Sequence, residues 1–454
     1  MNNEEILLFD TKSRQLQPLT SSDGKKLRIY SCGPTVYRDA HVGNMRTFLL
    51  TDLIKRFAQY QGLKVELIQN ITDVGHMSED FVNDDKMLTQ AKLENVDPFE
   101  IARKYEAKFH KDLADLNIVP AAGYPRASES IDLMLILIGK LIDADFAYVG
   151  SDSSVYFSAQ KFASYGAISG NKLDSLKPGH RYEYSEDGAK RFHADWALWK
   201  AAGDRTEMVW ESPWGKGFPG WHIECSAMSL ELLDGHVDIH VGGIDLRFPH
   251  HENERAQSNA LINTEAVDLW VHGEHLLFEG KKMSKSSGNV VLLKDVIERG
   301  IDPLAIRLCF LENKYRSQMD LTWSSIEAAH ETLKRWRMKM SQWGSENTLQ
   351  IDPEIESAFN TDLDTPRVIM RLREIEKSDS DNKASIFRYA DQVLGLDLDR
   401  PLETKVLTPQ MKTLLDERAL ARTEKRWADS DRLRVELENL GLEIKDTPEG
   451  QNWS

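Results

Sequence analysis

The segment that sets the architecture of this chain runs from residue 26 to residue 68 and reads KLRIYSCGPTVYRDAHVGNMRTFLLTDLIKRFAQYQGLKVELI. Its first seven residues alternate as a strand does, and the pattern breaks at Gly33-Pro34. From Asn44 to Tyr60 apolar residues recur at helical spacing, Gly62 ends that helix, and Val65–Ile68 begin a second strand. Two strands joined by a crossover helix predict a parallel sheet, and hence an α/β core of the Rossmann type.

The rest of the chain is organised around this core. Residues 131–141 read as a helix, residues 237–241 resume the strand pattern, and residues 326–343 form an amphipathic helix. Near the C-terminus we expect one charged helix over 416–440, a short strand over 442–445 and a turn at Thr447-Pro448. The expected order is a first half of the core at 1–74, a connective insertion at 75–220, the second half of the core at 221–275, a lysine-rich loop region at 276–325, a helical bundle at 326–405 and a small terminal domain at 406–454.

The composition is that of a globular protein with several domains. The chain has 454 residues, 41% of them hydrophobic, and a formal net charge of −16, which argues against a surface covered in nucleic acid but not against a local basic face. Residues 1–5 carry acid where a signal peptide needs base, and the longest apolar run, 133–138, is too short to cross a bilayer. Three widely spaced cysteines predict reduced thiols, so we expect a cytoplasmic protein without a membrane partner.

A first chemical motif follows the first strand. His41-Val-Gly-Asn44 stands at the start of the predicted helix, where Gly43 lets the backbone approach a ligand and a helix N-terminus favours an anion. The imidazole of His41 and the amide of Asn44 can both donate to a phosphate oxygen. Alone, the tetrapeptide is more typical of a loop histidine that binds nothing.

A second motif is the run GKKMSKSSGN at 280–289, which has three lysines, at 281, 282 and 285. Small residues around these lysines predict a loop that can close on a triphosphate and neutralise the leaving pyrophosphate. A solvated charged face is the simpler reading of its composition.

Together, Lys282-Met-Ser-Lys-Ser286 and His41-Val-Gly-Asn44 resemble the paired KMSKS and HIGH signatures of class I aminoacyl-tRNA synthetases, in the same order and separated by a long insertion. Asn44 departs from the final histidine of HIGH. The resemblance implies ATP as substrate, accompanied by Mg²⁺. It implies catalytic roles for His41, Asn44, Lys282 and Lys285, and an ATP site formed by Pro34, His41, Gly43, Asn44, Lys282 and Lys285.

A third constellation consists of potential metal ligands. His250 and Glu254 are four residues apart and share one face if their segment is helical, while Cys32 and Cys225 lie in separate segments elsewhere. Two sulfurs, one nitrogen and one oxygen suit Zn²⁺. The spacing alone leaves open two buried thiols and a surface His-His-Glu cluster.

Three of these segments, 32–37, 220–225 and 250–254, resemble the motifs of cysteinyl-tRNA synthetases. The resemblance implies that Cys32, Cys225, His250 and Glu254 hold a zinc ion that binds the sulfur of the substrate cysteine. It also implies that Gly33, Thr72 and Trp221 line the cysteine pocket. Zinc binds a thiolate far better than a hydroxyl, so such a site distinguishes cysteine from serine where an apolar pocket cannot. The third cysteine, Cys309, stands in an apolar helical stretch and is expected to be buried and inert.

The C-terminal segment concentrates basic residues and carries two tryptophans, Trp427 and Trp453, that can stack on unpaired bases. Acids alternate with these basic residues, so a helix with internal salt bridges is the alternative. The basic residues are Arg418, Arg422, Lys425, Arg426, Arg432 and Arg434. The segments 425–431 and 446–450 resemble the anticodon-binding end of cysteinyl-tRNA synthetases.

The family resemblance implies a monomeric ligase that acts on L-cysteine, ATP and tRNA-Cys. One competing interpretation is a related ligase that joins cysteine to an amino-sugar in mycothiol synthesis, which lacks the anticodon-binding end. A second is an RNA-binding protein without catalytic activity.

Overall fold

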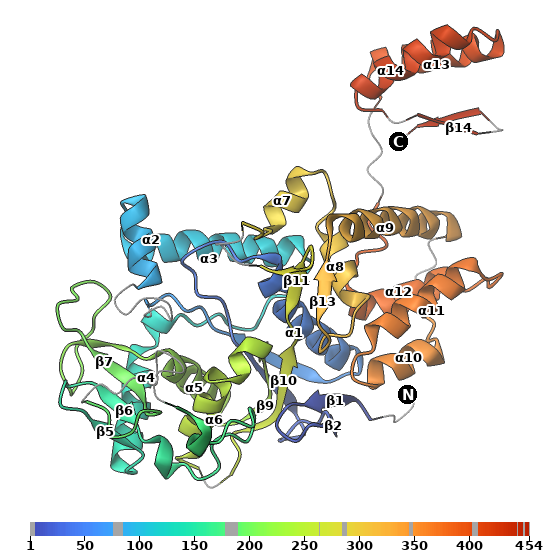
Figure 1. Cartoon of the computed structure of the whole chain (residues 1–454). Helices are drawn as coiled ribbons and strands as arrows, with labels where there is room; N and C mark the ends of the chain where they lie inside the picture. The colour runs from blue at the N-terminus through green and yellow to red at the C-terminus, as the bar shows by residue number, and fades with distance from the viewer. Residues whose placement is uncertain are drawn as a thin grey trace. The chain divides into compact units, whose positions relative to one another are not determined.

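The computed structural model of the chain describes residues 5–75, 85–177, 189–262, 264–283, 288–344, 348–401, 407–442, 444–447 and 450–453 (Figure 1). These residues form two compact units, 1–398 and 399–454.

The centre of the first unit is a four-stranded parallel sheet of order β10-β9-β3-β4. Helix α1 (Val42–Tyr60) connects β3 (Lys26–Ser31) to β4 (Lys64–Gln69), as the sequence predicted. The other two strands are β9 (Val237–Gly243) and β10 (Val267–Gly273). The Rossmann-type fold class is therefore confirmed.

Helix α1 lies in the main hydrophobic core. Its apolar residues point both towards the sheet and away from it, and the side chains of Phe48, Leu49, Leu53, Ile54 and Phe57 are all buried. A helix that is packed on more than one side is a rigid support for whatever its N-terminus presents.

The segment between β4 and the second half of the sheet is long. It contains helices and an antiparallel sheet of order β5-β6-β7-β8. Its elements are α2 (Lys86–Glu94), α3 (Pro98–Asp115), η1 (Ala127–Glu129), α4 (Ile131–Asp143), β5 (Ala147–Val149), β6 (Val155–Phe157), η2 (Ala159–Lys161), η3 (Leu173–Ser175), β7 (Trp196–Ala201) and β8 (Gly217–Pro219). Because the buried face of α3 shares the hydrophobic core of α1, this segment is part of the same packed unit as the parallel sheet.

Helices α5 (Trp221–Leu232) and α6 (His250–Asn259) flank β9, and η5 (Ile244–Arg247) leads from β9 into α6. A small three-stranded sheet of order β12-β11-β13 follows β10. Its strands and neighbouring helices are β11 (Leu276–Phe278), β12 (Lys281–Lys282), α7 (Leu293–Glu298), α8 (Leu304–Leu311) and β13 (Met319–Leu321).

A helical bundle completes the first unit, and the amphipathic helix predicted at 326–343 is present as α9 (Trp323–Trp343). The bundle also contains α10 (Pro353–Asn360), α11 (Thr365–Lys377) and α12 (Lys383–Leu394). An N-terminal hairpin of β1 (Leu7–Asp10) and β2 (Gln15–Pro18) pairs antiparallel.

The second unit differs from the prediction of one helix over 416–440. Two helices, α13 (Pro409–Thr423) and α14 (Trp427–Asn439), pack against each other, and a hairpin of β14 (Ile444–Thr447) and β15 (Gly450–Trp453) follows. The prediction was wrong because Lys425 adopts a left-handed conformation, with φ of 59°, which ends the first helix. Pro448, in the predicted turn, lies outside the described residues.

Candidate active site

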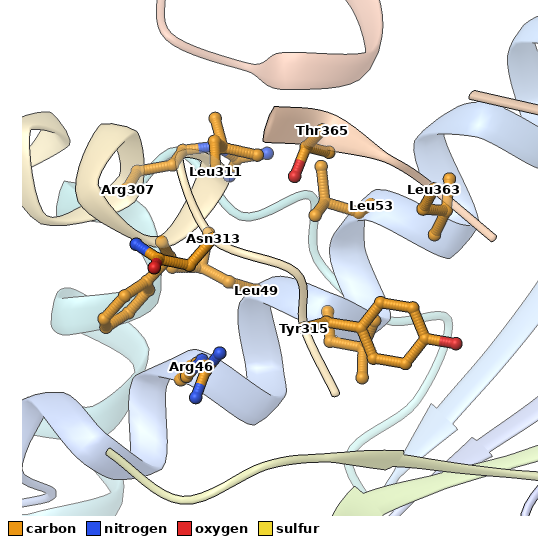
Figure 2. A pocket seen from close by; sticks show the side chains of 11 residues that line it. Arg46, Leu49, Leu53, Arg307, Leu311, Asn313, Tyr315, Leu363 and Thr365 are labelled. Atoms are coloured by element: carbon orange, nitrogen blue, oxygen red, sulfur yellow. The ribbon is translucent and has the colours of Figure 1, made fainter. Parts of the chain in front are cut away.

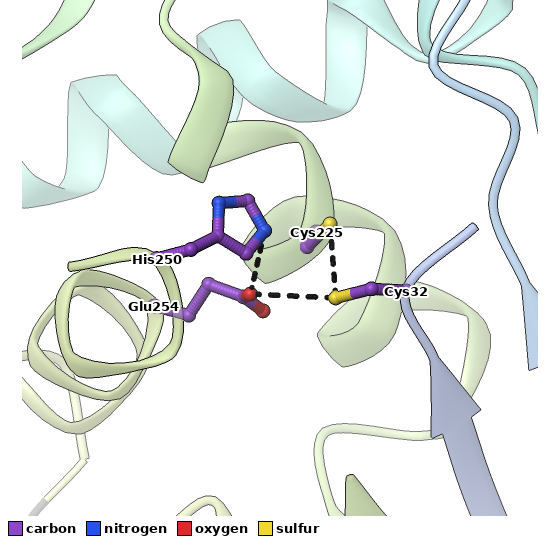
Figure 3. Close-up of side chains that lie close together, drawn as sticks. All are labelled: Cys32, Cys225, His250 and Glu254. Atoms are coloured by element: carbon purple, nitrogen blue, oxygen red, sulfur yellow. Dashed lines mark hydrogen bonds and ion pairs between the residues drawn. The ribbon is translucent and has the colours of Figure 1, made fainter. Parts of the chain in front are cut away.

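Two cysteines, a histidine and a glutamate converge where β3, α5 and α6 meet (Figure 3). Cys32 directly follows β3, Cys225 lies on α5, and His250 and Glu254 are one turn apart on α6. Each is at most 5% exposed. Cys32 Sγ lies 3.9 Å from Cys225 Sγ and 3.7 Å from Glu254 Oε1, and His250 Nε2 lies 2.9 Å from the same oxygen. The structure thus brings together the four residues that the sequence singled out as ligands.

These separations allow a fit test for a metal ion. Zinc bonds of about 2.0–2.3 Å in a tetrahedron place the ligand atoms about 3.3–3.8 Å apart. The sulfur–sulfur and sulfur–oxygen distances are close to that range. The His250–Glu254 pair is closer because the two groups form an ion pair, so it has to open slightly to admit a cation. Two thiols, an imidazole and a carboxylate are a donor set that zinc accepts.

A second donor set overlaps the first and was missed by the sequence analysis. Cys32 Sγ also lies 3.5 Å from His240 Nε2 and 3.3 Å from His251 Nε2. His240 Nε2 is in turn 3.5 Å from Glu254 Oε2, so Cys32 and Glu254 belong to both sets. His240 could have been found, because it stands near the end of a strand parallel to the one that ends before Cys32.

Further histidines fix the rings of the cluster. His250 Nδ1 lies 2.9 Å from His222 Nδ1, and His251 Nδ1 lies 2.8 Å from His272 Nε2. The other nitrogen of His272 lies 2.8 Å from the hydroxyl of Thr11. Partners of this kind hold a ligand ring in one orientation and one tautomer.

Burial also sets the protonation of these rings. It lowers the pKa of His240 to about 4 and that of His251 well below its ordinary value, so both are neutral near pH 7. Burial opposes charge on His250 as well, but the Glu254 carboxylate and Cys225 raise its pKa to about 10. Without a cation, His250 therefore keeps the proton that pairs it with Glu254, and a cation bound here displaces that proton.

The predicted cysteine-pocket residues border the cluster. The ring of Trp221, the first residue of α5, lies 4.3 Å from the ring of His250, measured between centroids. The hydroxyl of Thr72 donates to Glu224 Oε2 at 2.9 Å and accepts from Asn70 Nδ2 at 3.1 Å. Asn70 and the fully buried Glu224 were not predicted, although Glu224 stands directly before Cys225 in the motif.

Gly33 holds the loop after β3 against the loop after β4. Its N–H donates to Asn70 Oδ1 at 2.8 Å, and a Cβ at this position would lie 1.5 Å from the Asn70 carbonyl oxygen. The Pro34 carbonyl accepts from the Thr72 N–H at 3.1 Å. Only glycine permits this approach, which fixes Cys32 and Thr72 relative to each other.

The His41-Val-Gly-Asn44 motif forms the N-terminus of α1. The Asn44 N–H donates to His41 Nδ1 at 3.3 Å, and the His41 N–H donates to Asn44 Oδ1 at 3.1 Å, so the two residues form a reciprocal cap. Burial, followed by the nearby Arg38, lowers the pKa of His41 to about 4. A neutral ring whose Nδ1 accepts carries its proton on Nε2, which can donate to an oxyanion.

The beginning of the lysine-rich segment, at Lys282 and Met283, lies close to this motif. Lys282 is the exposed last residue of β12, and the methyl group of Met283 is so close to Gly43 that a Cβ there would lie 2.7 Å from it. Lys285 lies outside the described residues. A cleft of about 330 Å³ opens beside the motif. It is lined by Arg38, Asp39, His41, Gly288, Val290 and Leu292.

Comparison with known proteins assigns the family. A family model described as the class I (C) tRNA synthetase catalytic domain matches residues 18–331, and one described as the cysteinyl-tRNA ligase anticodon binding domain matches residues 404–453. The chain belongs to the cysteine–tRNA ligase family. The family predicted from the motifs is confirmed, and the match to the anticodon domain disfavours the amino-sugar ligase.

Relatives within the cysteine–tRNA ligase family match this chain over nearly its full length. A cysteine–tRNA ligase of Thermus thermophilus is 38% identical over 99% of both chains. The cysteine–tRNA ligase 1 of Burkholderia lata is 39% identical over 98% of this chain and 96% of its own. In fold, the chain resembles the methionyl-tRNA synthetase of Mycobacterium tuberculosis in complex with methionyl-adenylate, with a TM-score of 0.55 at 15% identity over 82% of this chain and 89% of that one.

The second unit corresponds to the anticodon-binding domain of the cysteine–tRNA ligase family. Arg418 is buried and donates to Asp446 at 2.9 and 3.0 Å and to Gln451 at 2.8 Å, so it holds the hairpin rather than facing solvent. Trp427 is 56% exposed, with the Arg422 guanidinium 5.8 Å from its ring centroid, and Trp453 is also exposed.

Most of the remaining predicted basic residues of this unit form ion pairs, and Arg422 pairs with Asp446 at 3.1 Å. Arg426, Arg432 and Arg434 form ion pairs with acids of their own segment, as the salt-bridged alternative expected.

Among the described residues of the whole chain, no helix combines the length and the apolarity that a bilayer span requires.

Proposed function

We propose that this chain activates L-cysteine with ATP and transfers the cysteinyl group to the 3′ end of tRNA-Cys. One observation carries the proposal: two thiols, an imidazole and a carboxylate meet at the end of β3, in the same sheet whose first helix presents the His41–Asn44 motif. In parallel α/β sheets, ligands bind at the carboxyl ends of the strands.

The amino acid site is proposed to consist of Cys32, Cys225, His250 and Glu254 as ligands of one zinc ion. Bound there, zinc would take the substrate sulfur as thiolate, which serine cannot offer. Trp221 covers the side chain of the substrate, and Thr72 and the backbone at Gly33 orient its amino and carboxylate groups. The hydrogen bonds of Thr72 to Asn70 and Glu224 fix the hydroxyl for this task.

The ATP site is proposed to lie between Pro34, the His41–Asn44 turn and the lysine loop. His41 donates from Nε2 to a phosphate oxygen, Asn44 adds its amide, and Gly43 allows the close approach. Lys282 and Lys285 neutralise the pyrophosphate as it forms, and Mg²⁺ accompanies the nucleotide.

The reaction has two steps. An oxygen of the cysteine carboxylate attacks the α-phosphorus of ATP, the bond to the β-phosphate oxygen breaks, and pyrophosphate leaves. A hydroxyl of the terminal ribose of tRNA then attacks the carbonyl carbon of the adenylate, and AMP leaves. The residues named accelerate the first step by positioning the reactants and stabilising charge, and none becomes covalently attached to substrate.

Several wider features belong to the same proposal. We expect the enzyme to be monomeric, as the family resemblance implies, and cytoplasmic, in keeping with its three free cysteines. The divisions at residues 74, 220, 275, 325 and 405 separate the two core halves, the insertion, the lysine-loop and stem-contact region, the bundle and the anticodon-binding region.

The test measures cysteine-dependent pyrophosphate exchange, charging of tRNA-Cys and metal content on the same preparation. We expect one zinc per chain, exchange without tRNA, and no serine charging at rates comparable to cysteine. Cys225→Ser should lose activity and alter metal binding. Cys309→Ser is the matched control, because Cys309 is an equally buried thiol that contacts the Ser325 carbonyl instead. Full activity in metal-free protein, or serine charged as fast as cysteine, would refute the proposal.

A further inference from the structure

Arg46, two residues beyond the His41–Asn44 motif, donates to four backbone carbonyls of two separate segments. Its Nη1 donates to the carbonyls of Glu274 and His275 at 2.8 and 3.0 Å. Its Nη2 donates to those of Lys314 and Ser317 at 3.0 and 2.7 Å. The side chain is almost fully buried, at 4% exposure of the residue.

Both segments lead into the sheet that carries the lysine loop. Residues 274–275 connect β10 to β11, and residues 314–317 connect α8 to β13. Strand β11 pairs with β13 on one side and with β12, which ends at Lys282, on the other. The Asp320 carboxylate accepts the Gly280 N–H at 2.9 and 3.0 Å at the turn between β11 and β12. Arg46 therefore joins α1, which begins at the His41–Asn44 motif, to the two connections that lead into the sheet of β12, β11 and β13.

Two other contacts between the described parts of these regions are more local. Met283 packs on Gly43 through a flexible side chain, and the Val42 N–H donates to the Val291 carbonyl at 3.0 Å beyond the loop. Neither contact reaches the connections before β11 and β13. Only a group with several donors in a fixed plane can bind four carbonyls at once, which arginine does and lysine does not.

The surroundings of Arg46 leave little room for it to shift. Figure 2 shows it on α1 near the loop that carries Asn313 and Tyr315. The cavity between α1, α8 and this loop measures about 20 Å³, which is about the space of a single water molecule.

We infer that Arg46 is a positioning residue for adenylate formation. By fixing the base of the sheet that contains β12 to α1, it sets the distance between Lys282, the last residue of β12, and the phosphates held by the His41–Asn44 turn. It touches no substrate. The inference rests on the proposed function of these two motifs, and it predicts that the damage from losing Arg46 falls on catalysis rather than on cysteine binding.

The experiment compares Arg46→Lys with Arg337→Lys in cysteine-dependent pyrophosphate exchange. Arg337 is the matched control, since it is also buried and donates to the carbonyls of Leu396 and Asp397, but on α9 of the bundle. Melting temperature is measured for both variants. Arg46→Lys should lower kcat by about 10-fold to 100-fold, raise the KM for ATP, and leave the KM for cysteine within about twofold. Arg337→Lys should lower the melting temperature without this change in kcat.

The outcomes separate the two claims. If the unaltered chain shows no cysteine-dependent exchange, the proposed function fails. If the chain is active and Arg46→Lys keeps full kcat while folded, the inference is overturned. It is overturned as well if kcat and both KM values change alike, or if Arg337→Lys at equal loss of stability reproduces the effect. Should Arg46→Lys not fold, Arg46→Gln, which keeps two donors, is measured against the same control.

Discussion

Replacing Gly33 by alanine tests whether the close contact between the loops after β3 and β4 is needed for activity. The new Cβ would lie 1.5 Å from the Asn70 carbonyl oxygen, whereas non-bonded atoms rest at about 3.5 Å. One loop must therefore move by about 2 Å, and the Gly33 N–H loses its 2.8 Å bond to Asn70. Cys32 precedes this glycine, so the shift displaces a proposed zinc ligand and Thr72 relative to each other.

A displacement of about 1 Å in a reacting geometry can cost about 100-fold in rate, or about 2.7 kcal/mol of transition-state stabilisation. We expect Gly33→Ala to lose at least that factor in kcat/KM for cysteine in pyrophosphate exchange, together with part of its bound zinc. Gly139→Ala is the control: a Cβ there meets nothing within 4 Å, and alanine favours its helix. A Gly33→Ala variant with activity within about threefold of the original chain would show that the reasoning from this contact is wrong.

Three further outcomes are expected. Asp52→Asn should lower the free energy of unfolding, measured by urea titration, by about 3–5 kcal/mol, because it leaves the fully buried Arg307 guanidinium without its carboxylate. Glu129→Gln, which removes an exposed ion pair, should change the free energy of unfolding by under about 1 kcal/mol. Burial lowers the pKa of His272 to about 3, so the unfolded chain takes up a proton below about pH 6.5 that the folded chain refuses, and stability falls as the pH drops from 6.5 towards 3. His272→Gln should therefore make the loss of stability between pH 7 and pH 5 smaller by up to about 2 kcal/mol, and an unchanged pH dependence would contradict the assignment. Trp427→Ala should raise the KM for tRNA-Cys by about 10-fold while pyrophosphate exchange stays unchanged, and equal charging kinetics would exclude base stacking by this ring.

Local pattern was enough to predict the core of the fold. The strand before Cys32, the helix after His41 and the strand at 65–68 lie within two residues of their predicted bounds, because alternation and helical spacing report which side chains are buried. The end of a helix at Lys425 was not predicted, because the left-handed backbone of this lysine cannot be recognised from the order of charged residues. The same limit applies to Arg418, which was grouped with the other basic residues of its segment and is in fact buried against Asp446, a residue that follows it by 28 positions.

The residues of the candidate site could be predicted where they belong to short sequence motifs. They could not be predicted where only the fold brings them together. Cys32, Cys225, His250 and Glu254 were singled out by resemblance, and the structure gathers them. Asn70 stands two residues before the predicted Thr72, but its bonds to Gly33 and Thr72 could not be predicted, because they form only when the ends of two strands lie side by side. Arg46 stands two residues after a known motif, yet its four carbonyl partners lie more than two hundred residues away.

Because the two donor sets overlap, the loss of one metal ligand does not by itself remove the capacity to bind a metal ion. Metal content alone is therefore an incomplete measure of what a ligand substitution does. In a variant without the Cys225 thiol, four potential ligands still lie close together: Cys32, His240, His251 and Glu254. Such a variant can retain a full complement of metal and yet hold it displaced, with one sulfur fewer and a different face turned to the incoming amino acid. Replacing zinc by cobalt makes the difference visible, because the intensity of thiolate-to-cobalt charge transfer reports how many sulfurs remain bound.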